Sequence, residues 1–299
     1  MIHNIVPTNL SSPVSWPLTN RGLFSELLVY CYVKQVLSRH NVELRLVSSF
    51  KHVRYWQSLF PGLDIKSSLY PSSILFSPNH SKQLLLNRAL FSFPFMPDHR
   101  PNELFRVLWD IAAEQHYFYN LETYQKVADC LHSTLSLSPA YNSVRNILSA
   151  SSEHYNAVHV RRGDKTYNQN PEAIPMSLDT YIKYIRQACN TSDLIYLFGD
   201  SSLTLQTLHD KLLCEGYQKV EIMLPHRTDN KSGYNQLLFN TMTLQERIEY
   251  NRSFMHDFGY MTNAHVFIGS FSSCVGRSAA LLRNFKRSYS VDTRFSIVQ

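Results

Sequence analysis

Arg161 and Arg162 directly follow the apolar stretch Ala157–Val160, and Asp164 and Lys165 come shortly after them. An arginine side chain presents a rigid planar fork of donors that matches two phosphate oxygens at once. A loop at the end of a strand is also where open α/β sheets place their ligands. The run therefore points to phosphate binding, with Asp164 orienting the arginines. The alternative is an exposed basic loop after an ordinary strand.

Two later apolar stretches also end in polar loops. Leu194–Phe198 runs into Gly199–Ser202, and Val266–Ile268 runs into Gly269–Ser273. If all three stretches are parallel strands, their loops meet at one edge of a sheet. The third loop opens a helix, where free N–H groups and serine hydroxyls favour an anion. Together these loops strengthen the prediction of a phosphate site.

The second half of the chain alternates short apolar stretches with segments of helical periodicity. The expected strands are 157–160, 194–198, 220–224 and 266–268, and the expected helices are 178–189, 203–213, 244–261 and 274–282. This alternation predicts a parallel sheet covered by helices, which is the α/β fold class.

The first half has fewer clear boundaries. A helix is expected over 25–38, a strand over 42–47 and two helices within 103–135, whereas 56–60 and 91–101 are expected to be irregular packing segments. Gly22, just before the first helix, could let a ligand approach the backbone or could simply belong to a helix cap. The serine-rich segment 137–153 is the expected junction, which gives domains 1–148 and 149–299.

Length and composition limit the classes of protein. The 299 residues, 44% of them hydrophobic, suffice for two domains of about 150 residues. The net charge of +6 suits an acidic ligand, but the 29 Lys and Arg residues are scattered, so nucleic-acid binding is not predicted. We expect no signal peptide and no transmembrane segment, because apolar runs of about 18 residues are missing.

The cysteines and histidines argue against cross-links and metals. The five cysteines are far apart and odd in number, which indicates free thiols of a reducing compartment. The thirteen histidines include no HxH or HExxH pair, so no metal site is predicted. A cytoplasmic protein is therefore expected.

Three sequence blocks together resemble a known family. HVRRGDK, IYLFGDSS and AHVFIGSFSSCVGR, the last preceded by a helix with Asp257, resemble in order and spacing the blocks of the α1,6-fucosyltransferase family, which is related to the α1,2- and protein O-fucosyltransferases. The resemblance covers Tyr155–Asp292. It implies a GT-B glycosyltransferase architecture of two Rossmann-like domains facing a cleft, with the donor GDP-fucose on the C-terminal domain and the acceptor on the N-terminal side. It also implies inversion at the anomeric carbon without a metal or other cofactor.

The resemblance implies roles for single residues. Arg161 matches the arginine that holds the β-phosphate, and His159 with Asp257 matches the pair that reads guanine. The chemistry is consistent, because a carboxylate accepts from both N1–H and N2–H of guanine and is left unpaired by adenine.

Further matches surround the phosphates. Arg162, Asp164 and Lys165 match residues that the family needs around the phosphates and the fucose. Ser273, which follows Ser272 at the start of a helix, matches a serine that donates to the phosphates. We expect both serines to take part in nucleotide binding.

One further position differs from the family, and another matches it. Asp200 matches the first of two adjacent aspartates, but Ser201 replaces the second, so the role of that carboxylate does not carry over. Tyr181 matches a tyrosine at the start of the next helix and is expected in the nucleotide site.

The catalytic base depends on how the loop after the arginines is counted. An inverting transfer needs a carboxylate close to the acceptor hydroxyl. Counting forward places the family glutamate on Gln169, whereas counting back from Tyr181 places it on Glu172 if the loop has three extra residues. Glu172 is the expected base, and Asp179, another base or none are the alternatives.

The leading hypothesis is transfer of L-fucose from GDP-fucose to a hydroxyl of an oligosaccharide acceptor. One alternative is a non-catalytic GDP-sugar-binding protein, motivated by Ser201 and the displaced glutamate. A transferase that uses another GDP-sugar or a protein Ser/Thr acceptor is a further alternative. Because the accessory regions of the animal enzymes are missing, a bacterial or viral origin is expected.

Overall fold

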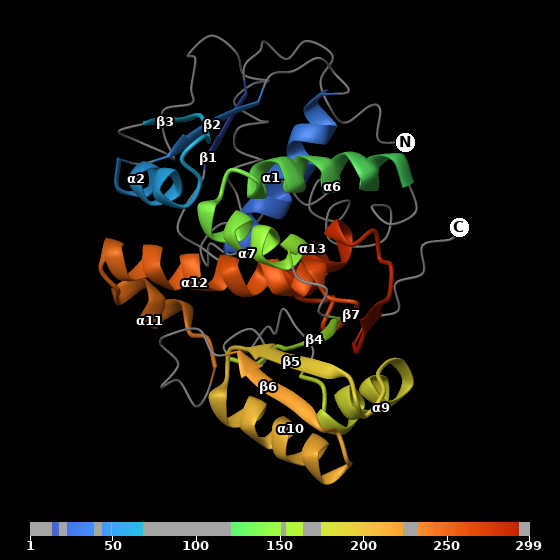
Figure 1. Ribbon diagram of the computed structural model, residues 1–299. Coiled ribbons are helices and arrows are strands. Elements are labelled where there is room, and N and C mark those ends of the chain that lie inside the picture. Colours follow the sequence, from blue (N-terminus) through green and yellow to red (C-terminus); the bar gives the residue numbers. More distant parts are fainter. Residues whose placement is uncertain are drawn as a thin grey trace. The chain divides into compact units, whose positions relative to one another are not determined.

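A computed structural model describes residues 14–17, 23–38, 44–48, 50–67, 121–150, 154–163, 175–223 and 233–292. The chain has two compact units, Met1–Leu131 with Ser296–Gln299, and His132–Phe295. Each unit has its own parallel sheet (Figure 1), so the fold is mixed α/β as the sequence predicts. In the described part of the chain, every helix is too short or too polar to span a bilayer.

Strands and helices alternate in the first unit. Its strands β1 (Val14–Pro17), β2 (Leu44–Ser48) and β3 (Ile65–Ser67) form a parallel sheet in that order. Helix α1 (Leu23–Ser38) connects β1 with β2, and α2 (Phe50–Leu59) connects β2 with β3. The first expected helix and strand are confirmed to within two residues at each end.

Helix α2 corrects the prediction that residues 56–60 pack irregularly. Val53, Trp56 and Phe60 are buried at helical spacing. The Phe60 N–H donates to the Trp56 carbonyl at 2.8 Å, and the two rings stack with centroids 5.9 Å apart. The aromatic content of this stretch had obscured its helical period. Helix α6 (Leu121–Leu135) is one of the helices expected within 103–135, whereas 103–120 and 91–101 lie outside the described residues.

The second unit contains a five-stranded parallel sheet. Its strands are β4 (Tyr155–Val160), β5 (Leu194–Gly199), β6 (Lys219–Met223), β7 (Val266–Gly269) and β8 (Ser288–Ser290). They lie in the order β6-β5-β4-β7-β8 (Figure 1). The chain therefore builds the sheet outward from β4 in one direction and then from β7 in the other. Between β4 and β7 lies a topological switch point, where open α/β sheets bind ligands.

Six helices of the second unit are described: α7 (Pro139–Ala150), α9 (Leu178–Ala188), α10 (Ser202–Cys214), α11 (Gln236–Thr241), α12 (Leu244–Asn263) and α13 (Cys274–Leu282). The four helices expected after residue 150 are confirmed to within two residues at each end, as α9, α10, α12 and α13. The four expected strands are confirmed equally closely.

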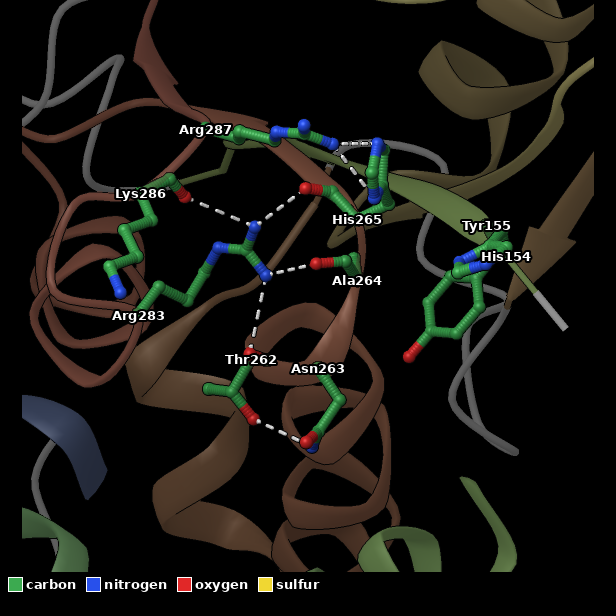
Figure 2. A pocket seen from close by; sticks show the side chains of 9 residues that line it. All are labelled: His154, Tyr155, Thr262, Asn263, Ala264, His265, Arg283, Lys286 and Arg287. Carbon is green, nitrogen blue, oxygen red and sulfur yellow. Dashed lines mark hydrogen bonds between the residues drawn. The ribbon is translucent and has the colours of Figure 1, made fainter. Parts of the chain in front are cut away.

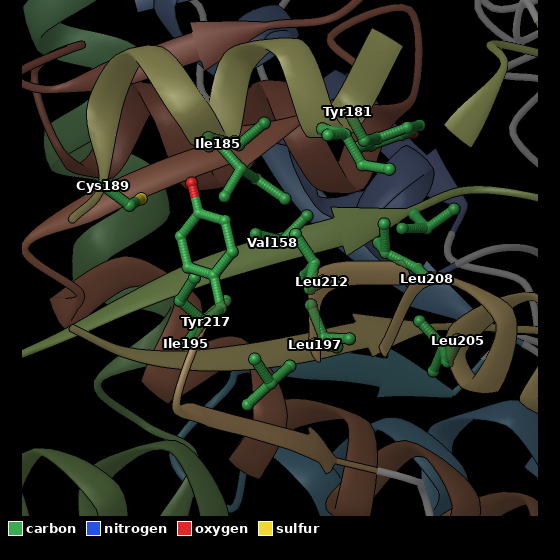
Figure 3. Close-up of a cluster of buried hydrophobic side chains, with 14 of the residues drawn as sticks. Val158, Tyr181, Ile185, Cys189, Ile195, Leu197, Leu205, Leu208, Leu212 and Tyr217 are labelled. Atoms are coloured by element: carbon green, nitrogen blue, oxygen red, sulfur yellow. The ribbon is translucent and has the colours of Figure 1, made fainter. Parts of the chain in front are cut away.

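Side-chain alternation along β4 gives the sheet two different faces. Val158 and Val160 join a buried cluster with the apolar sides of α9 and α10, such as Ile185 and Leu208 (Figure 3). The ring of Tyr155 points to the other face and contacts Tyr260 of α12, with centroids 5.8 Å apart. Because side chains alternate with a period of two, His159 lies on the α12 face with Tyr155.

Some elements of the second unit were not predicted. The helix α7 lies within the expected junction 137–153, of which residues 151–153 are outside the described ones; Tyr141 and Val144 are buried, and the Tyr141 hydroxyl hydrogen-bonds to that of Thr262 in α12 at 3.2 Å. The strand β8 and the helix α11 have three and six residues, too few to show a periodicity in the sequence.

Candidate functional site

The loops after β4 and β7 flank the switch point of the second sheet. Val160 pairs with Gly199 of β5, and His159 pairs with Gly269 of β7. This register brings together the three polar loops that the sequence singled out, at the carboxyl edge of the sheet. Helices α9 and α13 follow β4 and β7. The arrangement is the one in which a crevice for a ligand forms.

Arg161 is held by an aspartate from the neighbouring strand. Its guanidinium forms an ion pair with Asp200, and the two side chains are 12% and 10% exposed. The other carboxylate oxygen of Asp200 accepts from the Arg162 N–H at 2.7 Å. Asp200 therefore orients the arginine loop, a role that the sequence had suggested for Asp164. Asp164 itself lies outside the described residues.

The guanidinium of Arg162 binds the backbone of its own loop. One terminal nitrogen donates to the Arg161 carbonyl at 3.1 Å, and the other donates to the Met176 carbonyl at 2.7 Å. Arg162 thus connects the loop with the segment that enters α9. These contacts assign Arg162 a role in shaping the loop.

Gly163 and Gly233 let the arginine loop pack closely against the segment before α11. Gly163 has a φ of +77°, and a Cβ at this position would overlap the Tyr234 backbone. Gly233 has a φ of +99° and packs against Gly163 in return. The Arg161 guanidinium lies over the Tyr234 ring, 5.6 Å from its centroid, a distance typical of a cation–π contact. No motif in the sequence had indicated Tyr234 as a site residue.

Tyr181 connects the loops on the two sides of the switch point. Its buried hydroxyl lies 2.9 Å from the Ser270 hydroxyl, and the main chain of Arg161 also hydrogen-bonds to it. Burial raises the pKa of Tyr181. Since the tyrosine stays neutral, it can donate one hydrogen bond while accepting another. The expected site residue therefore fixes the relative position of β4 and β7 at their carboxyl ends.

Asp292, which the sequence had not indicated as a site residue, holds the loop after β7. Its carboxylate accepts from the Phe271 N–H at 2.9 Å, from the Ser272 N–H at 3.4 Å and from the Ser272 hydroxyl. Ser272 is thus occupied by an internal carboxylate. Ser273 is the N-cap residue of α13, is 8% exposed and makes no capping hydrogen bond with its side chain.

His159 and Asp257 are both buried beside the α12 face of the sheet. They are 3% and 7% exposed. Burial, with a smaller contribution from the Arg161 charge, lowers the pKa of His159 to about 3, so its ring is neutral at pH 7. Within the described ranges, Nδ1 of this ring has no hydrogen-bond partner. Asp257 lies three residues before Tyr260 on α12, and its carboxylate is 3.8 Å from Nδ1 of His256.

Four expected site residues, Gly22, Asp164, Lys165 and Glu172, lie outside the described residues. The alternative base Asp179 is described; it is exposed and accepts from Lys211 at 2.8 Å. The Lys211 hydrogen bond and charge lower the pKa of Asp179, whereas a general base works best with a pKa near the working pH. Asp179 is therefore a weak candidate for the base.

Comparisons with known proteins add no family. A scan against models of protein families finds no match to this chain, and a search of curated protein sequences finds none. The resemblance to α1,6-fucosyltransferases therefore rests on the three sequence blocks. In the ranges that the structure describes, no group of three or more His, Cys, Asp or Glu side chains is arranged to hold a metal ion.

Proposed function

We propose that this protein is an inverting GT-B glycosyltransferase that transfers L-fucose from GDP-fucose to a glycan hydroxyl. The observation that carries the proposal is the position of Arg161 and Ser273 on the two sides of the β4/β7 switch point. On one side stands an oriented guanidinium, and on the other a helix N-terminus with an uncommitted serine side chain. A diphosphate has two charged phosphate groups, one for each of these partners.

In this proposal Arg161 holds the β-phosphate of the donor. Asp200 and Tyr234 fix its guanidinium before the ligand arrives, so little reorganisation is needed when negative charge develops on the leaving GDP. Asp200 also reduces the net charge of the site, which limits unspecific attraction of anions. The donor phosphates then bind by matching the geometry of an oriented fork.

Ser273 and the first N–H groups of α13 contact the phosphates from the other side. The neighbouring Ser272 is held by Asp292, so it positions the loop instead of donating to the nucleotide. The two adjacent serines thus have different roles: Ser273 contacts the phosphates, and Ser272 positions the loop. This refines the expectation that both take part in binding.

Guanine recognition involves His159 and Asp257. A buried aspartate carboxylate can accept the two N–H groups of guanine, and adenine offers no matching pair. Nδ1 of His159 is a buried polar atom that has no hydrogen-bond partner among the described residues, and such a deficit costs about 1–3 kcal/mol. A base bound next to it relieves this deficit.

The transfer itself is a single displacement. The acceptor oxygen forms a bond to C1 of fucose while the bond between C1 and the GDP oxygen breaks, and GDP leaves with the electron pair. The acceptor proton passes to a carboxylate, for which Glu172 is the proposed base. Arg161 and the α13 N-terminus stabilise the charge on the departing diphosphate.

A second candidate function is a protein that binds GDP-sugars without transferring them. The observation that favours it is the position of Ser201, which replaces an aspartate of the family. Its hydroxyl accepts from the Thr204 N–H at 3.3 Å and so caps α10. Ser201 therefore caps a helix, and the carboxylate that the family has at this position is missing.

The test is GDP release from GDP-fucose with a panel of oligosaccharides, with GDP-mannose as the donor control. We expect release with GDP-fucose and at least a hundredfold loss in Arg161→Gln. Arg186→Gln is the matched control, because Arg186 is exposed and lies away from the switch point. It forms an ion pair with Glu215 at a distance of 2.6 Å. Release that survives in Arg161→Gln contradicts the site.

Calorimetry of GDP binding, combined with the release assay, tests both the proposed base Glu172 and the binding-only function. Glu172→Gln should lose turnover and keep GDP binding, whereas Asp179→Asn should keep both. GDP binding without any release of GDP from GDP-fucose, even as slow hydrolysis, selects the binding protein over the transferase.

A further inference from the structure

A second basic region lies at the opposite, amino edge of the same sheet. A pocket of about 570 Å³ is formed where β4 and β7 begin, at the end of α12 and at the turn between α13 and β8 (Figure 2). Its lining includes the basic side chains of His154, His265, Arg283, Lys286 and Arg287. Among the described residues, no carboxylate contributes to the lining of this pocket.

Arg283 forms the floor of the pocket. Its guanidinium donates to the carbonyls of Thr262 at 3.2 Å, His265 at 3.1 Å and Lys286 at 3.3 Å, and also to that of Ala264 (Figure 2). These bonds satisfy carbonyls at the C-terminus of α12, where a cation is favourable. Burial lowers the pKa of Arg283 to about 10. Because its donors are occupied, Arg283 builds the pocket, and a ligand depends on the other cations.

The turn after α13 places the two cations Lys286 and Arg287 at the mouth of the pocket. Asn284, Phe285 and Arg287 have φ values of +50°, +54° and +45°. This left-handed region is unfavourable for residues other than glycine, and such strain is concentrated at functional positions. The Arg287 carbonyl accepts from the Phe267 N–H at 2.9 Å, which fixes the turn to β7.

Basic groups face one another in this pocket. The Arg287 guanidinium lies 3.0 Å from Nδ1 of His265, and the rings of His265 and His154 are in edge contact with centroids 5.6 Å apart (Figure 2). Burial lowers the pKa of His265, and the charges of Arg287, His154 and Arg283 lower it further, whereas Asp193 raises it. The Asp193 carboxylate already accepts from the Asn156 side chain at 3.1 Å and the Asn190 N–H at 2.9 Å.

We infer that this pocket binds a phosphate monoester of a small organic molecule. A doubly charged phosphate accepts from Arg287 and Lys286, and its charge favours protonation of the His265 ring, which then donates a third hydrogen bond to it. The volume is in the range of small-molecule sites and exceeds the space of a free phosphate ion. The organic part of the ester lies against the exposed ring of His154.

The experiment is titration of the whole protein at pH 7 with ribose 5-phosphate, inorganic phosphate and ribose, followed by calorimetry and by NMR of the histidine rings. His265→Gln assigns the His265 signal. We expect ribose 5-phosphate to shift this signal, to raise the pKa of His265 and to bind more tightly than inorganic phosphate; ribose should not bind. The variant Lys286→Gln/Arg287→Gln should bind at least tenfold more weakly.

Two controls locate the binding. Lys183→Gln/Lys219→Gln removes the same net charge at exposed positions outside the pocket and should change the affinity less than twofold. An equal loss in this control, or a loss in Arg161→Gln instead, contradicts the pocket. An unmoved His265 signal also overturns the proposal, and inorganic phosphate binding as tightly as the ester overturns its choice of ligand. These outcomes are independent of whether the carboxyl edge binds GDP.

Discussion

The two edges of the second sheet use arginine in opposite ways. At the carboxyl edge, Arg161 is mostly buried and paired with Asp200, and the neighbouring loop is held by Asp292. At the amino edge, Arg287 and Lys286 are exposed and line a pocket to which no described carboxylate contributes. A paired arginine is fixed in direction and gives geometric selectivity. An exposed arginine retains its charge and attracts anions with less regard to their shape.

Variants at the two edges should also differ in how much they change the stability of the protein. Removing one partner of a buried pair leaves a charge without compensation, whereas an exposed cation exchanges protein contacts for water. Variants at the carboxyl edge should therefore affect both folding and ligand binding. Variants at the amino edge should affect binding with little effect on folding.

The largest effect is expected for the Arg161–Asp200 pair. Arg161→Gln or Asp200→Asn should each lower the free energy of unfolding by about 3–5 kcal/mol, because each removes the ion-pair partner of a mostly buried charge. Arg287→Gln, at the amino edge, should change it by about 0.5 kcal/mol or less. Urea unfolding measures all three.

The double variant of this pair provides the control. Arg161→Gln/Asp200→Asn should lose less stability than the sum of the single variants, since the two changes remove the same ion pair. Additive losses would show that the pair is not coupled, and the contrast between the two edges would then have another cause.

The histidines of the two edges should respond differently to pH. The pKa of His159 falls from 6.5 to about 3 on folding. Below pH 6.5 the unfolded chain binds a proton there that the folded protein does not, so stability decreases as the pH falls. Each pH unit costs up to about 1.4 kcal/mol, or about 2–3 kcal/mol between pH 6.5 and 4.5.

His265, whose pKa is also lowered, should contribute in the same direction but less, because its ring is exposed. Urea unfolding at several pH values measures the slopes. The slope should become shallower in His159→Gln and change little in His265→Gln. Equal slopes in the wild type and His159→Gln would contradict the neutral buried ring.

The close approach of the arginine loop can be tested with two alanine variants. Gly163→Ala should destabilise the protein by about 2–3 kcal/mol, because a Cβ adds backbone strain and overlaps the Tyr234 main chain. Gly216 has a φ of +90° with no atom within 4 Å of a built Cβ. Gly216→Ala should therefore cost about 1 kcal/mol, from strain alone. Thermal unfolding of both variants compares them, and equal losses would remove the evidence for a tight loop contact.

The smallest effect is expected for the hydroxyl that joins β4 and β7. Tyr181→Phe should lower stability by about 1 kcal/mol, because the Ser270 hydroxyl and the Arg161 main chain lose a buried partner. It should also weaken GDP binding severalfold. Tyr217→Phe, in the same apolar cluster, is the control and should change neither quantity appreciably. Identical GDP affinities of wild type and Tyr181→Phe would contradict the positioning role.

The sequence alone determined the β/α alternation of the second unit and the identity of its polar loops. Helix α13 begins at Cys274 and ends at Leu282, as its periodicity predicts. Such elements are readable because each depends on a local pattern of apolar residues. The same local reading failed for α2 and α7, where aromatic or serine-rich composition concealed a buried face.

Only the tertiary structure decided which residues surround Arg161. The strand order places β7 beside β4, although more than a hundred residues separate their starts. Tyr181, Tyr234 and Asp292 reach the arginine loop or its neighbour from distant parts of the chain. Contacts of this kind depend on strand order and register, which no local periodicity specifies. The sequence therefore determined the chemistry of Arg161, whereas the fold determined that it is oriented by Asp200 and that its counterpart Arg287 lines a pocket to which no described carboxylate contributes.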